Sequence, residues 1–300
     1  MFQKITIIDD CGLTEPILEK LPAFSIKPIT IFNDFPETDE EIIRRIADSD
    51  CVLVSWRTKI TAEILKAAPS LKYIGMCCSL YDEKSANVDI AAARKFGIEV
   101  RGVRDYGDEG TVEFIFAQLI YLFKGMGKYK WSPSTTELKN KTMGIIGMGT
   151  LGKMVARTAL HFGMKVFYFS RNRKYDMEDE GVNYLSLDDL LETCDVVSIH
   201  LPKNTVLLGE KEFRRKKKNS ILVNTSLGLP FEKDAFVNWL VEDQTSFAIF
   251  DTGGVGTFLE EFQQLENVII YEQYAGFTVE AKGRLSEKVL EKLAAFLVKE

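Results

Sequence analysis

Residues 143–153 read MGIIGMGTLGK and decide the fold of the second half of the chain. A continuous apolar run leads into Gly147-x-Gly149-x-x-Gly152, and the helical pattern KMVARTALHFG follows at once. In such a strand, turn and helix, the first glycine permits a sharp turn, the second lets the backbone approach a pyrophosphate, and the third lets helix and strand pack closely. Free amides at the helix start then face the phosphates. The stretch therefore predicts a dinucleotide site; the alternative is a tight turn that binds nothing.

The end of the next strand bears on which dinucleotide is bound. An NAD site usually carries an acidic residue there, about 20 positions on, which hydrogen-bonds the ribose hydroxyls. This chain has Ser170 at that position, followed by Arg171. A carboxylate about 4 Å from a 2′-phosphate would be repelled by roughly 4 kcal/mol at an intermediate dielectric, and Ser170 removes that repulsion. The guanidinium of Arg171 can bind a phosphate through two parallel, charge-assisted hydrogen bonds. These residues favour NADP(H) as the cofactor, with NAD(H) as the alternative. A basic surface turn that binds no phosphate is the remaining interpretation.

Strand-like and helix-like stretches alternate outward from this turn along the whole chain. Continuous β-branched runs are typical of parallel strands buried on both faces, so the alternation predicts an α/β protein with doubly wound parallel sheets. In the first part we expect strands at 4–9, 26–32, 51–56, 71–77 and 98–103, with helices at 38–49 and 61–69. After a longer helix at 110–126 we expect strands at 142–148, 165–169, 195–201, 220–225, 246–251 and 267–271, and a final helix at 278–298.

Composition narrows the class of partner. A chain of 300 residues is long enough for two domains with separate cores. The net charge of −6 argues against nucleic acid as the main partner. No apolar run is long enough for a bilayer, and MFQKITIIDD does not resemble a signal peptide. Five cysteines show neither a disulfide framework nor zinc-ligand spacing, so no metal is expected and a reducing cytoplasm is the simplest location. The basic run at 214–218 is interpreted as a solvated loop.

The order of segments resembles the D-2-hydroxyacid dehydrogenase family over nearly the whole chain. The stretches that carry the resemblance are LKYIGMCCSLYD, NVDIAAARKFGIEV, DEGTVEFIFAQLI, KTMGIIGMGTLGKMVA, DVVSIHLP, ILVNTSLG, FAIFD and ENVIIYEQYAG. The resemblance implies a flavodoxin-like substrate domain at 1–104, an inserted Rossmann-type doubly wound cofactor domain at 105–275, and a C-terminal helix at 276–300 that returns to the substrate domain. It also implies a small-molecule substrate and a homodimer formed through the cofactor domains.

The resemblance also assigns cofactor contacts beyond the glycine turn. Thr150 and Leu151 would face the pyrophosphate, and Asp251 would hold the nicotinamide carboxamide. The remaining contacts would be His200 and Pro202 on the adenosine side, and Thr225 and Ser226 on the loop that approaches the nicotinamide.

The three side chains on which the family's chemistry depends are replaced. The position of the arginine that clamps the substrate carboxylate holds Leu227, that of the supporting glutamate holds Gly256, and that of the proton-exchanging histidine holds Gln273. The chain has only two histidines, and both His161 and His200 are better explained as structural residues. A positioned acid or base typically contributes roughly a hundred- to ten-thousand-fold to the rate. Ordinary interconversion of 2-hydroxy and 2-keto acids should therefore be very slow.

The expected substrate loop departs from the family as well. Where the family has small glycines that expose amides to the carboxylate, this chain has Cys78 and Leu80 on either side of Ser79, and four extra residues precede Asn87. These side chains would crowd a small carboxylate and make the pocket more apolar. The pair at 77–78 is either reactive or, as the safer interpretation, a buried strand end.

The sequence leads to two hypotheses about function, one for an enzyme and one for a binding protein. The first is an NADP(H)-dependent oxidoreductase that acts on a carbonyl/CH–OH or imine substrate, because hydride transfer is the cofactor's own chemistry and needs only some proton source. Glu272, Tyr274 and Tyr106 are weak candidates for that source, and each is more often a structural residue. The second is a catalytically silent NAD(P)-binding protein that acts through a partner. A true hydroxyacid dehydrogenase with relocated groups is a third, less favoured interpretation.

Overall fold

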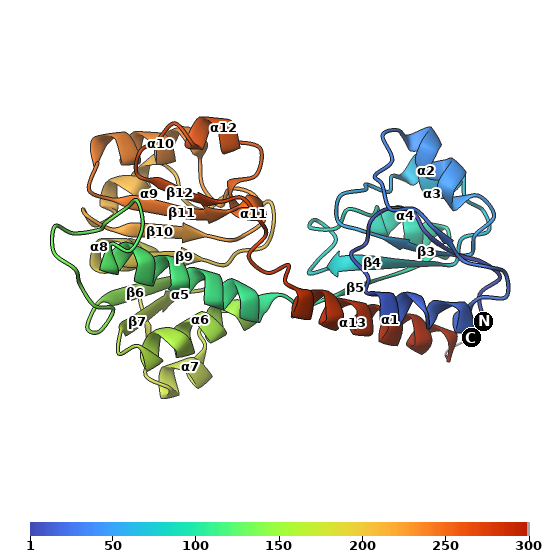
Figure 1. The fold of residues 1–300 in the computed structure, drawn as a ribbon, viewed down its shortest axis with the longest axis horizontal. Coiled ribbons are helices and arrows are strands. Elements are labelled where there is room, and N and C mark those ends of the chain that lie inside the picture. Colours follow the sequence, from blue (N-terminus) through green and yellow to red (C-terminus); the bar gives the residue numbers. More distant parts are fainter. Residues whose placement is uncertain (299–300) are drawn as a thin grey trace. The chain divides into compact units, whose positions relative to one another are not determined.

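The computed structural model describes residues 1–298 and divides into two compact units. Unit 1 contains Met1–Tyr106 together with the segment that begins at Thr278, and unit 2 contains Gly107–Phe277 (Figure 1). The chain therefore leaves unit 1, builds unit 2 and returns to unit 1 for its last helix.

Unit 1 is built on a parallel sheet with the strand order β2-β1-β3-β4-β5. The strands are β1 (Ile5–Ile7), β2 (Thr30–Ile31), β3 (Cys51–Val54), β4 (Tyr73–Ser79) and β5 (Glu99–Val103). This is the order of the flavodoxin-like doubly wound fold, in which the direction of winding reverses between β1 and β3. The predicted fold class is confirmed for this unit.

Helices of unit 1 begin where the sequence provides caps. Thr38, Thr61, Asp89 and Thr278 each accept a hydrogen bond from an amide in the first turn of the helix that follows. The helical elements are α1 (Glu15–Leu18), the 3-10 turn η1 (Leu21–Phe24), α2 (Asp39–Ile46), α3 (Ala62–Lys66), α4 (Ile90–Lys95) and α13 (Val279–Leu297). The apolar side of α13 is buried in one cluster with β1, β3 and β4, and α13 runs beside α1 (Figure 1). Packing against the first sheet thus makes the last helix part of unit 1.

Unit 2 contains a second parallel sheet with the order β12-β11-β10-β9-β6-β7-β8. The strands are β6 (Thr142–Ile146), β7 (Lys165–Phe169), β8 (Asn183–Tyr184), β9 (Val196–Ile199), β10 (Ile221–Asn224), β11 (Phe247–Asp251) and β12 (Val268–Tyr271). The strand order reverses between β6 and β9, as in Rossmann-type sheets, so the fold class is confirmed here too. Sequence reasoning missed β8, because its two residues at the edge of the sheet form no apolar run.

Helices cover both faces of the second sheet. The helices are α5 (Asp108–Lys124), α6 (Thr150–His161), α7 (Tyr175–Asp179), α8 (Leu187–Thr193), α9 (Glu210–Arg215), α10 (Lys233–Glu242), α11 (Thr252–Val255) and α12 (Leu259–Phe262). Side chains of α5 and α6 share one buried cluster with β6 and β7, and those of α8, α9 and α10 share another with β9, β10 and β11. Because α5 lies beside α6 on the same face, the long helix predicted at 110–126 is part of the core of unit 2 (Figure 1).

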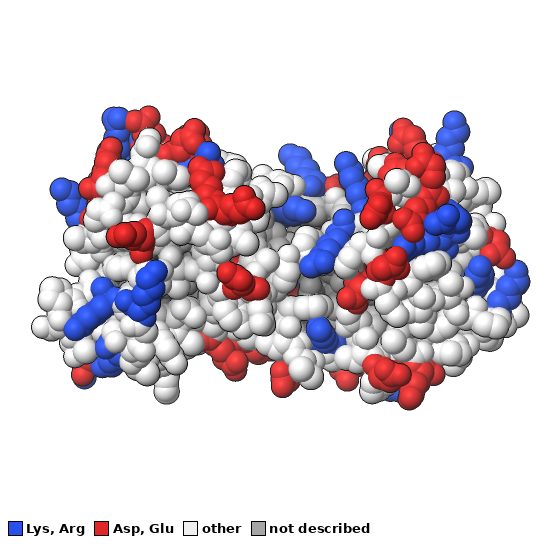
Figure 2. Space-filling view, turned by 45° about the horizontal axis from the view of Figure 1, so that its top comes forward, with Lys and Arg blue, Asp and Glu red and all other residues white. Residues whose placement is uncertain are grey.

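Charged side chains are mixed on the surface. Figure 2 shows acidic and basic residues interspersed over the face that it displays. Within residues 1–298, no helix combines the length and the apolar character that crossing a membrane requires. All five cysteines are buried and none forms a disulfide, and the described residues contain no group of three or more His, Cys, Asp or Glu that could hold a metal.

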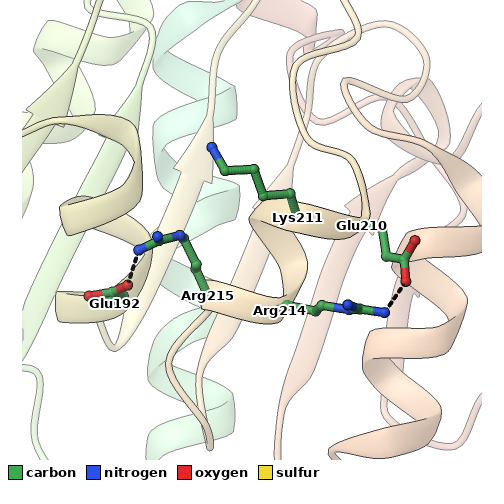
Figure 3. Close-up of a pocket in the computed structure, with 5 residues that line it drawn as sticks. All are labelled: Glu192, Glu210, Lys211, Arg214 and Arg215. Carbon is green, nitrogen blue, oxygen red and sulfur yellow. Dashed lines mark hydrogen bonds and ion pairs between the residues drawn. The ribbon is translucent and has the colours of Figure 1, made fainter.

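The basic run at 214–218 is only partly the solvated loop that we predicted. Arg214 and Arg215 end α9 and are paired with Glu210 and Glu192, beside a shallow hollow of about 550 Å³ between α8 and α9 (Figure 3). Lys216 is 5% exposed, contrary to the prediction. Its ammonium donates to Ser220 Oγ at 2.7 Å and lies 4.8 Å from the centre of the Trp239 ring. Burial lowers the pKa of Lys216 to about 7. The polar partner and the ring hold an amine that the apolar core would otherwise exclude.

We predict that Lys216→Met changes how stability depends on pH. An unfolded chain keeps this lysine protonated up to a pKa of about 10.4, whereas the folded protein releases the proton near pH 7. The unfolded state therefore binds more protons between these values, and this lysine makes the wild type more stable as pH rises through that window, by up to about 1.4 kcal/mol per pH unit. In Lys216→Met that contribution is absent. Urea denaturation at pH 7, 8 and 9 measures it, with exposed Lys218→Met as the control; parallel profiles for Lys216→Met and the wild type would contradict the assignment.

Candidate functional site

The glycine turn lies where the winding of the second sheet reverses. The amide of Gly147 donates to the carbonyl of Phe169 at 2.9 Å, and the amide of His200 donates to the carbonyl of Ile146 at 2.8 Å. Gly147 has a φ of +98°, and a Cβ there would lie 2.2 Å from the carbonyl oxygen of His200. Only glycine fits this position, because both the backbone conformation and the space exclude a side chain. The carboxyl ends of β6, β7 and β9 are thereby joined around one turn.

The other two glycines of the turn have different surroundings. A Cβ on Gly152 would lie 2.1 Å from the carbonyl oxygen of Gly147, so α6 packs directly on the turn. A Cβ on Gly149 would meet no atom within 4 Å. Gly149 is also the residue before α6, and no side chain caps the amides of that helix. The turn therefore presents helix amides, including those of Thr150 and Leu151, beside open space, which is what a pyrophosphate requires.

Two buried polar atoms at this edge of the sheet have no partner within residues 1–298. They are Nδ1 of His200, after β9, and Oγ1 of Thr225, after β10. The other ring nitrogen of His200 shares a hydrogen bond with Ser198 Oγ at 2.9 Å, and burial lowers the pKa of His200 to about 3, so the imidazole is neutral at pH 7. An unsatisfied buried polar atom costs about 1–3 kcal/mol, which a bound polar ligand can offset. Both atoms belong to residues that we predicted as cofactor contacts, and they fit such a ligand.

The end of β7 leaves one arginine available. Arg173 forms a two-point ion pair with Glu178, and Tyr168 donates to the same carboxylate at 2.6 Å. In contrast, the guanidinium of Arg171 makes no hydrogen bond or ion pair within the described residues. Arg171 follows half-buried Ser170 and is exposed. Sequence reasoning did not separate the two arginines, because Glu178 reaches Arg173 only once α7 has folded back against β7.

Asp251 has a structural role that the sequence did not reveal. One carboxylate oxygen accepts from the amide of Gly254 at 2.7 Å and caps α11, and the other accepts from the amide of Ala275 at 2.9 Å. Burial raises the pKa of Asp251 to about 6 despite these two hydrogen bonds. Each oxygen of a carboxylate has a second acceptor position, so the side chain still has capacity for a carboxamide. Asp251 therefore ties the end of β11 to the segment after β12.

The loop after β10 is held by a residue that we did not single out. The side-chain amide of Asn224 donates to the carbonyls of Gly228 and Gly254, both at 3.0 Å, and its oxygen accepts from the amide of Ser226 at 3.1 Å. Ser226 Oγ in turn donates to the carbonyl of Ile199 and accepts from the amide of Leu201, both at 3.1 Å. Pro202 follows directly and is half-buried. The asparagine that ends the apolar run at 221–223 was the available signal, since a buried amide must find partners.

Leu227, Gly256 and Gln273, which we predicted to stand at the family's catalytic positions, follow β10, β11 and β12, and none of them carries a titratable group. Leu227 is 40% exposed, and its Cδ2 lies 3.2 Å from the position of a Cβ on Gly253. Gly256 has a φ of +59°. A Cβ there would lie 3.7 Å from Cα of Gly228, the residue that follows Leu227. The carbonyl of Gln273 accepts from the amide of Thr252 at 3.1 Å, and its exposed side chain accepts from Tyr271.

The weak proton-donor candidates are in different surroundings. Glu272 is exposed and accepts from Gln263 Nε2 at 3.1 Å. The ring of Tyr274 lies 3.3 Å from a Cβ placed on Gly253, beside Leu227. Tyr106 belongs to unit 1, where burial raises the pKa of its hydroxyl well above the usual range.

The predicted substrate loop is packed into the sheet of unit 1. Cys78 lies buried in β4, as the safer interpretation held, and its thiol donates to Asn87 Oδ1 at 3.6 Å. Ser79 ends the strand, and Leu80 bonds to the carbonyl of Val103 through its amide. Leu80 also fills the space above Gly102, where a Cβ would lie 2.4 Å from its own.

A comparison with protein families agrees with this arrangement. The model described as "D-isomer specific 2-hydroxyacid dehydrogenase, NAD binding domain" matches residues 116–272. This chain belongs to the D-isomer specific 2-hydroxyacid dehydrogenase family. The resemblance seen in the sequence is confirmed, and with it an NAD-binding, oxidoreductase type of fold.

Individual relatives extend the match to both units. A glyoxylate reductase of Korarchaeum cryptofilum is 33% identical over 289 residues, which cover 88% of this chain and 84% of the relative. Among solved structures, an acyclic imino acid reductase in complex with NADPH and D-Arg has a TM-score of 0.82 at 24% identity, covering 99% of this chain and 97% of the other. The apo D-lactate dehydrogenase of Escherichia coli has a TM-score of 0.78 at 22% identity, covering 99% and 98%. These two structures are similar to this chain in fold.

We predict that alanine separates the roles of two glycines in the turn. Gly152→Ala places a methyl group against the carbonyl of Gly147, so it should lower the free energy of unfolding by about 2 kcal/mol or more. Gly149→Ala meets no neighbour, so it should cost less than about 1 kcal/mol. Gly149→Ala should nevertheless raise the Kd for NADPH about tenfold, because its methyl group enters the space left for the pyrophosphate. Urea denaturation and calorimetric titration measure the two effects. Equal NADPH affinity of Gly149→Ala and the wild type would contradict the placement of the pyrophosphate.

Proposed function

We propose that this protein is an NADP(H)-dependent oxidoreductase that acts on a carbonyl/CH–OH or imine substrate. The observation that carries the choice of cofactor is the end of β7, where Ser170 stands in place of a carboxylate and Arg171 has no protein partner within residues 1–298. An unpaired guanidinium beside a site free of carboxylate favours a 2′-phosphate. Membership of an NAD-binding oxidoreductase family supports the class of reaction.

When bound, the nicotinamide would supply or accept the hydride. The chain's own residues would hold the rest of the cofactor. The amides after Gly149 bind the pyrophosphate, and Arg171 binds the 2′-phosphate. His200 Nδ1 and Thr225 Oγ1, which have no hydrogen-bond partner within the described residues, would form hydrogen bonds with the bound cofactor. The remaining acceptor positions of Asp251 orient the carboxamide.

The replaced catalytic positions bear on the substrate. Reduction of a carbonyl requires a proton for the new hydroxyl, and Leu227, Gly256 and Gln273 supply none. A protonated imine already carries its proton on nitrogen, so hydride addition to its carbon yields the amine without an acid from the protein. The loss of the histidine position is thus less costly for an imine than for a ketone. The imino acid reductase solved with NADPH is consistent with this preference. For a carbonyl substrate, the donor would be Glu272, Tyr274 or Tyr106.

Two further features of the proposal rest on the family resemblance: a homodimer formed through unit 2 and a small-molecule substrate. We also propose that the protein acts in the cytoplasm, because its five cysteines show neither a disulfide framework nor zinc-ligand spacing.

A second candidate function is a catalytically silent NAD(P)-binding protein that acts through a partner. The observation that favours it is the joint replacement at Leu227, Gly256 and Gln273 beside a glycine turn with every glycine in place. A substrate panel separates the two. The protein is titrated with NADPH and NADH, and NADPH oxidation is then followed with keto acids, aldehydes and preformed imines. Turnover supports the oxidoreductase, and tight NADPH binding without turnover on any member of the panel supports the silent binder.

We predict that two substitutions after β7 change the cofactor preference in the same direction. Arg171→Met should weaken NADPH binding about tenfold and leave NADH binding unchanged, because only the 2′-phosphate contact is lost. Ser170→Asp should shift the preference towards NADH, because its carboxylate repels the phosphate. Exposed Lys165→Met, at the opposite end of β7, is the matched control for charge. Calorimetry gives the NADPH and NADH affinities of the wild type and of the three variants. An unchanged ratio of NADPH to NADH affinity in both site variants would rule out this phosphate site.

A further inference from the structure

The segment between β7 and α7 is fixed by hydrogen bonds at both of its ends. At its start, the carbonyl of Phe169 accepts from the amide of Gly147 at 2.9 Å, so the segment begins on the glycine turn. At its end, the amide of Lys174 donates to the hydroxyl of Tyr168 at 2.6 Å. The residues between these two bonds, 170–173, include the serine and the arginine on which the proposed choice of NADPH depends.

The hydroxyl of Tyr168 connects this segment with α7. Tyr168 is fully buried in β7, and its hydroxyl donates to Glu178 Oε1 at 2.6 Å while it accepts from the amide of Lys174. A phenol has one proton to donate and an ionised carboxylate only accepts, so the directions of both bonds are settled. The same carboxylate binds Nε and Nη2 of Arg173. Strand, segment and helix are therefore joined at one phenolic oxygen.

The ring of Tyr168 has packing contacts that do not depend on its hydroxyl. The ring of Tyr184, in β8, lies edge-on to it, with 5.4 Å between the ring centroids. On the other side of this pair, the central carbon of the Arg173 guanidinium lies 4.8 Å from the centre of the Tyr184 ring. The hydroxyl of Tyr184 forms no hydrogen bond within the described residues. The two neighbouring tyrosines thus differ in that only the hydroxyl of Tyr168 is bonded to the segment.

Arg171 lies within this tied segment. Its exposed guanidinium makes no hydrogen bond or ion pair within the described residues, whereas that of Arg173 is bound to Glu178. An arginine on a loose segment loses backbone and side-chain freedom when it binds an anion, and a backbone that is fixed beforehand lowers this cost. The two bonds that tie the segment lie two residues before and three residues after Arg171. The backbone that carries the free guanidinium is therefore short and held at both ends.

We propose that Tyr168 is a positioning residue for NADPH: its hydroxyl holds the backbone of 170–173 so that Arg171 meets the 2′-phosphate. The inference rests on the proposed function and adds a determinant of cofactor preference that is buried and does not itself touch the phosphate. Because NADH lacks the 2′-phosphate, the contribution of this hydroxyl should be confined to NADPH. Because it acts through Arg171, it should disappear when that guanidinium is removed.

Calorimetric titration of the full chain with NADPH and NADH tests the inference without requiring turnover. Tyr168→Phe removes the hydroxyl and keeps the ring, so it should raise the Kd for NADPH about fivefold and leave the Kd for NADH unchanged. Tyr184→Phe removes the neighbouring hydroxyl, which is not bonded, and should bind both nucleotides as the wild type does. In the Arg171→Met background, Tyr168→Phe should cause no further loss of NADPH affinity.

Hydrogen exchange in the wild type without nucleotide is a second measurement, which does not depend on the folding of a variant. The amide of Lys174 should be protected, because it is bonded to a buried hydroxyl. Exchange of this amide as fast as in an unfolded chain would show that the segment is not held. In Tyr168→Phe the exchange of Lys174 should become faster, and urea denaturation checks that the variant is folded under the conditions of the titration.

Three outcomes of the titrations would overturn the inference. Equal weakening of NADPH and NADH binding by Tyr168→Phe, or a loss that adds to that of Arg171→Met, would show a general structural role. Unchanged or tighter NADPH binding would show that the tied segment does not help Arg171. The effect of Arg171→Met alone separates this test from that of the proposed function. If it weakens NADPH binding and Tyr168→Phe does not, the positioning role fails and the phosphate site stands; if Arg171→Met has no effect, the phosphate site itself fails and the inference fails with it.

Discussion

The organisation of unit 2 depends on the contact between Gly147 and the backbone of His200. With 2.2 Å between the carbonyl oxygen of His200 and the position of a Cβ, the strands β6 and β9 can end side by side only if residue 147 has no side chain. Gly152 imposes the same condition on α6, which packs against the carbonyl of Gly147. These two contacts bring the start of α6 to the carboxyl ends of β6 and β9. The helix amides then face open space rather than protein.

Hydrogen bonding at this edge distinguishes structural residues from those left for a ligand. Asp251 and Asn224 are buried, and their side chains form hydrogen bonds with backbone groups of the loops that follow the strands. His200 Nδ1 and Thr225 Oγ1 are buried without partners in the described chain. Since buried polar atoms are nearly always paired in native proteins, these two unpaired atoms beside the glycine turn fit a polar ligand there. The same reasoning separates Arg171 from Arg173, whose charge is taken up by Glu178.

Family membership and chemistry lead to different conclusions for this protein. The match over residues 116–272 and the glyoxylate reductase relative establish the family, and the strand orders of both sheets agree with the predicted fold. The residues that we predict at its catalytic positions are nevertheless Leu227, Gly256 and Gln273, whose side chains neither bind an anion as a cation would nor exchange a proton. A fold can host altered chemistry because function resides in the side chains of the site. A substrate that carries its own proton would suit the residues that are present.

The sequence by itself determined the two doubly wound sheets and the glycine turn between β6 and α6. These features are encoded in contiguous residues, as apolar runs, glycine spacing and residue identity. Only the tertiary structure decided that Lys216 is buried, that Asp251 caps α11, that Glu178 pairs with Arg173, and that the guanidinium of Arg171 forms no hydrogen bond or ion pair within the described residues. The physical reason is that a polar group's state depends on which distant segments pack around it. Local sequence patterns place a side chain on a strand or turn, but they do not specify the neighbours that satisfy it.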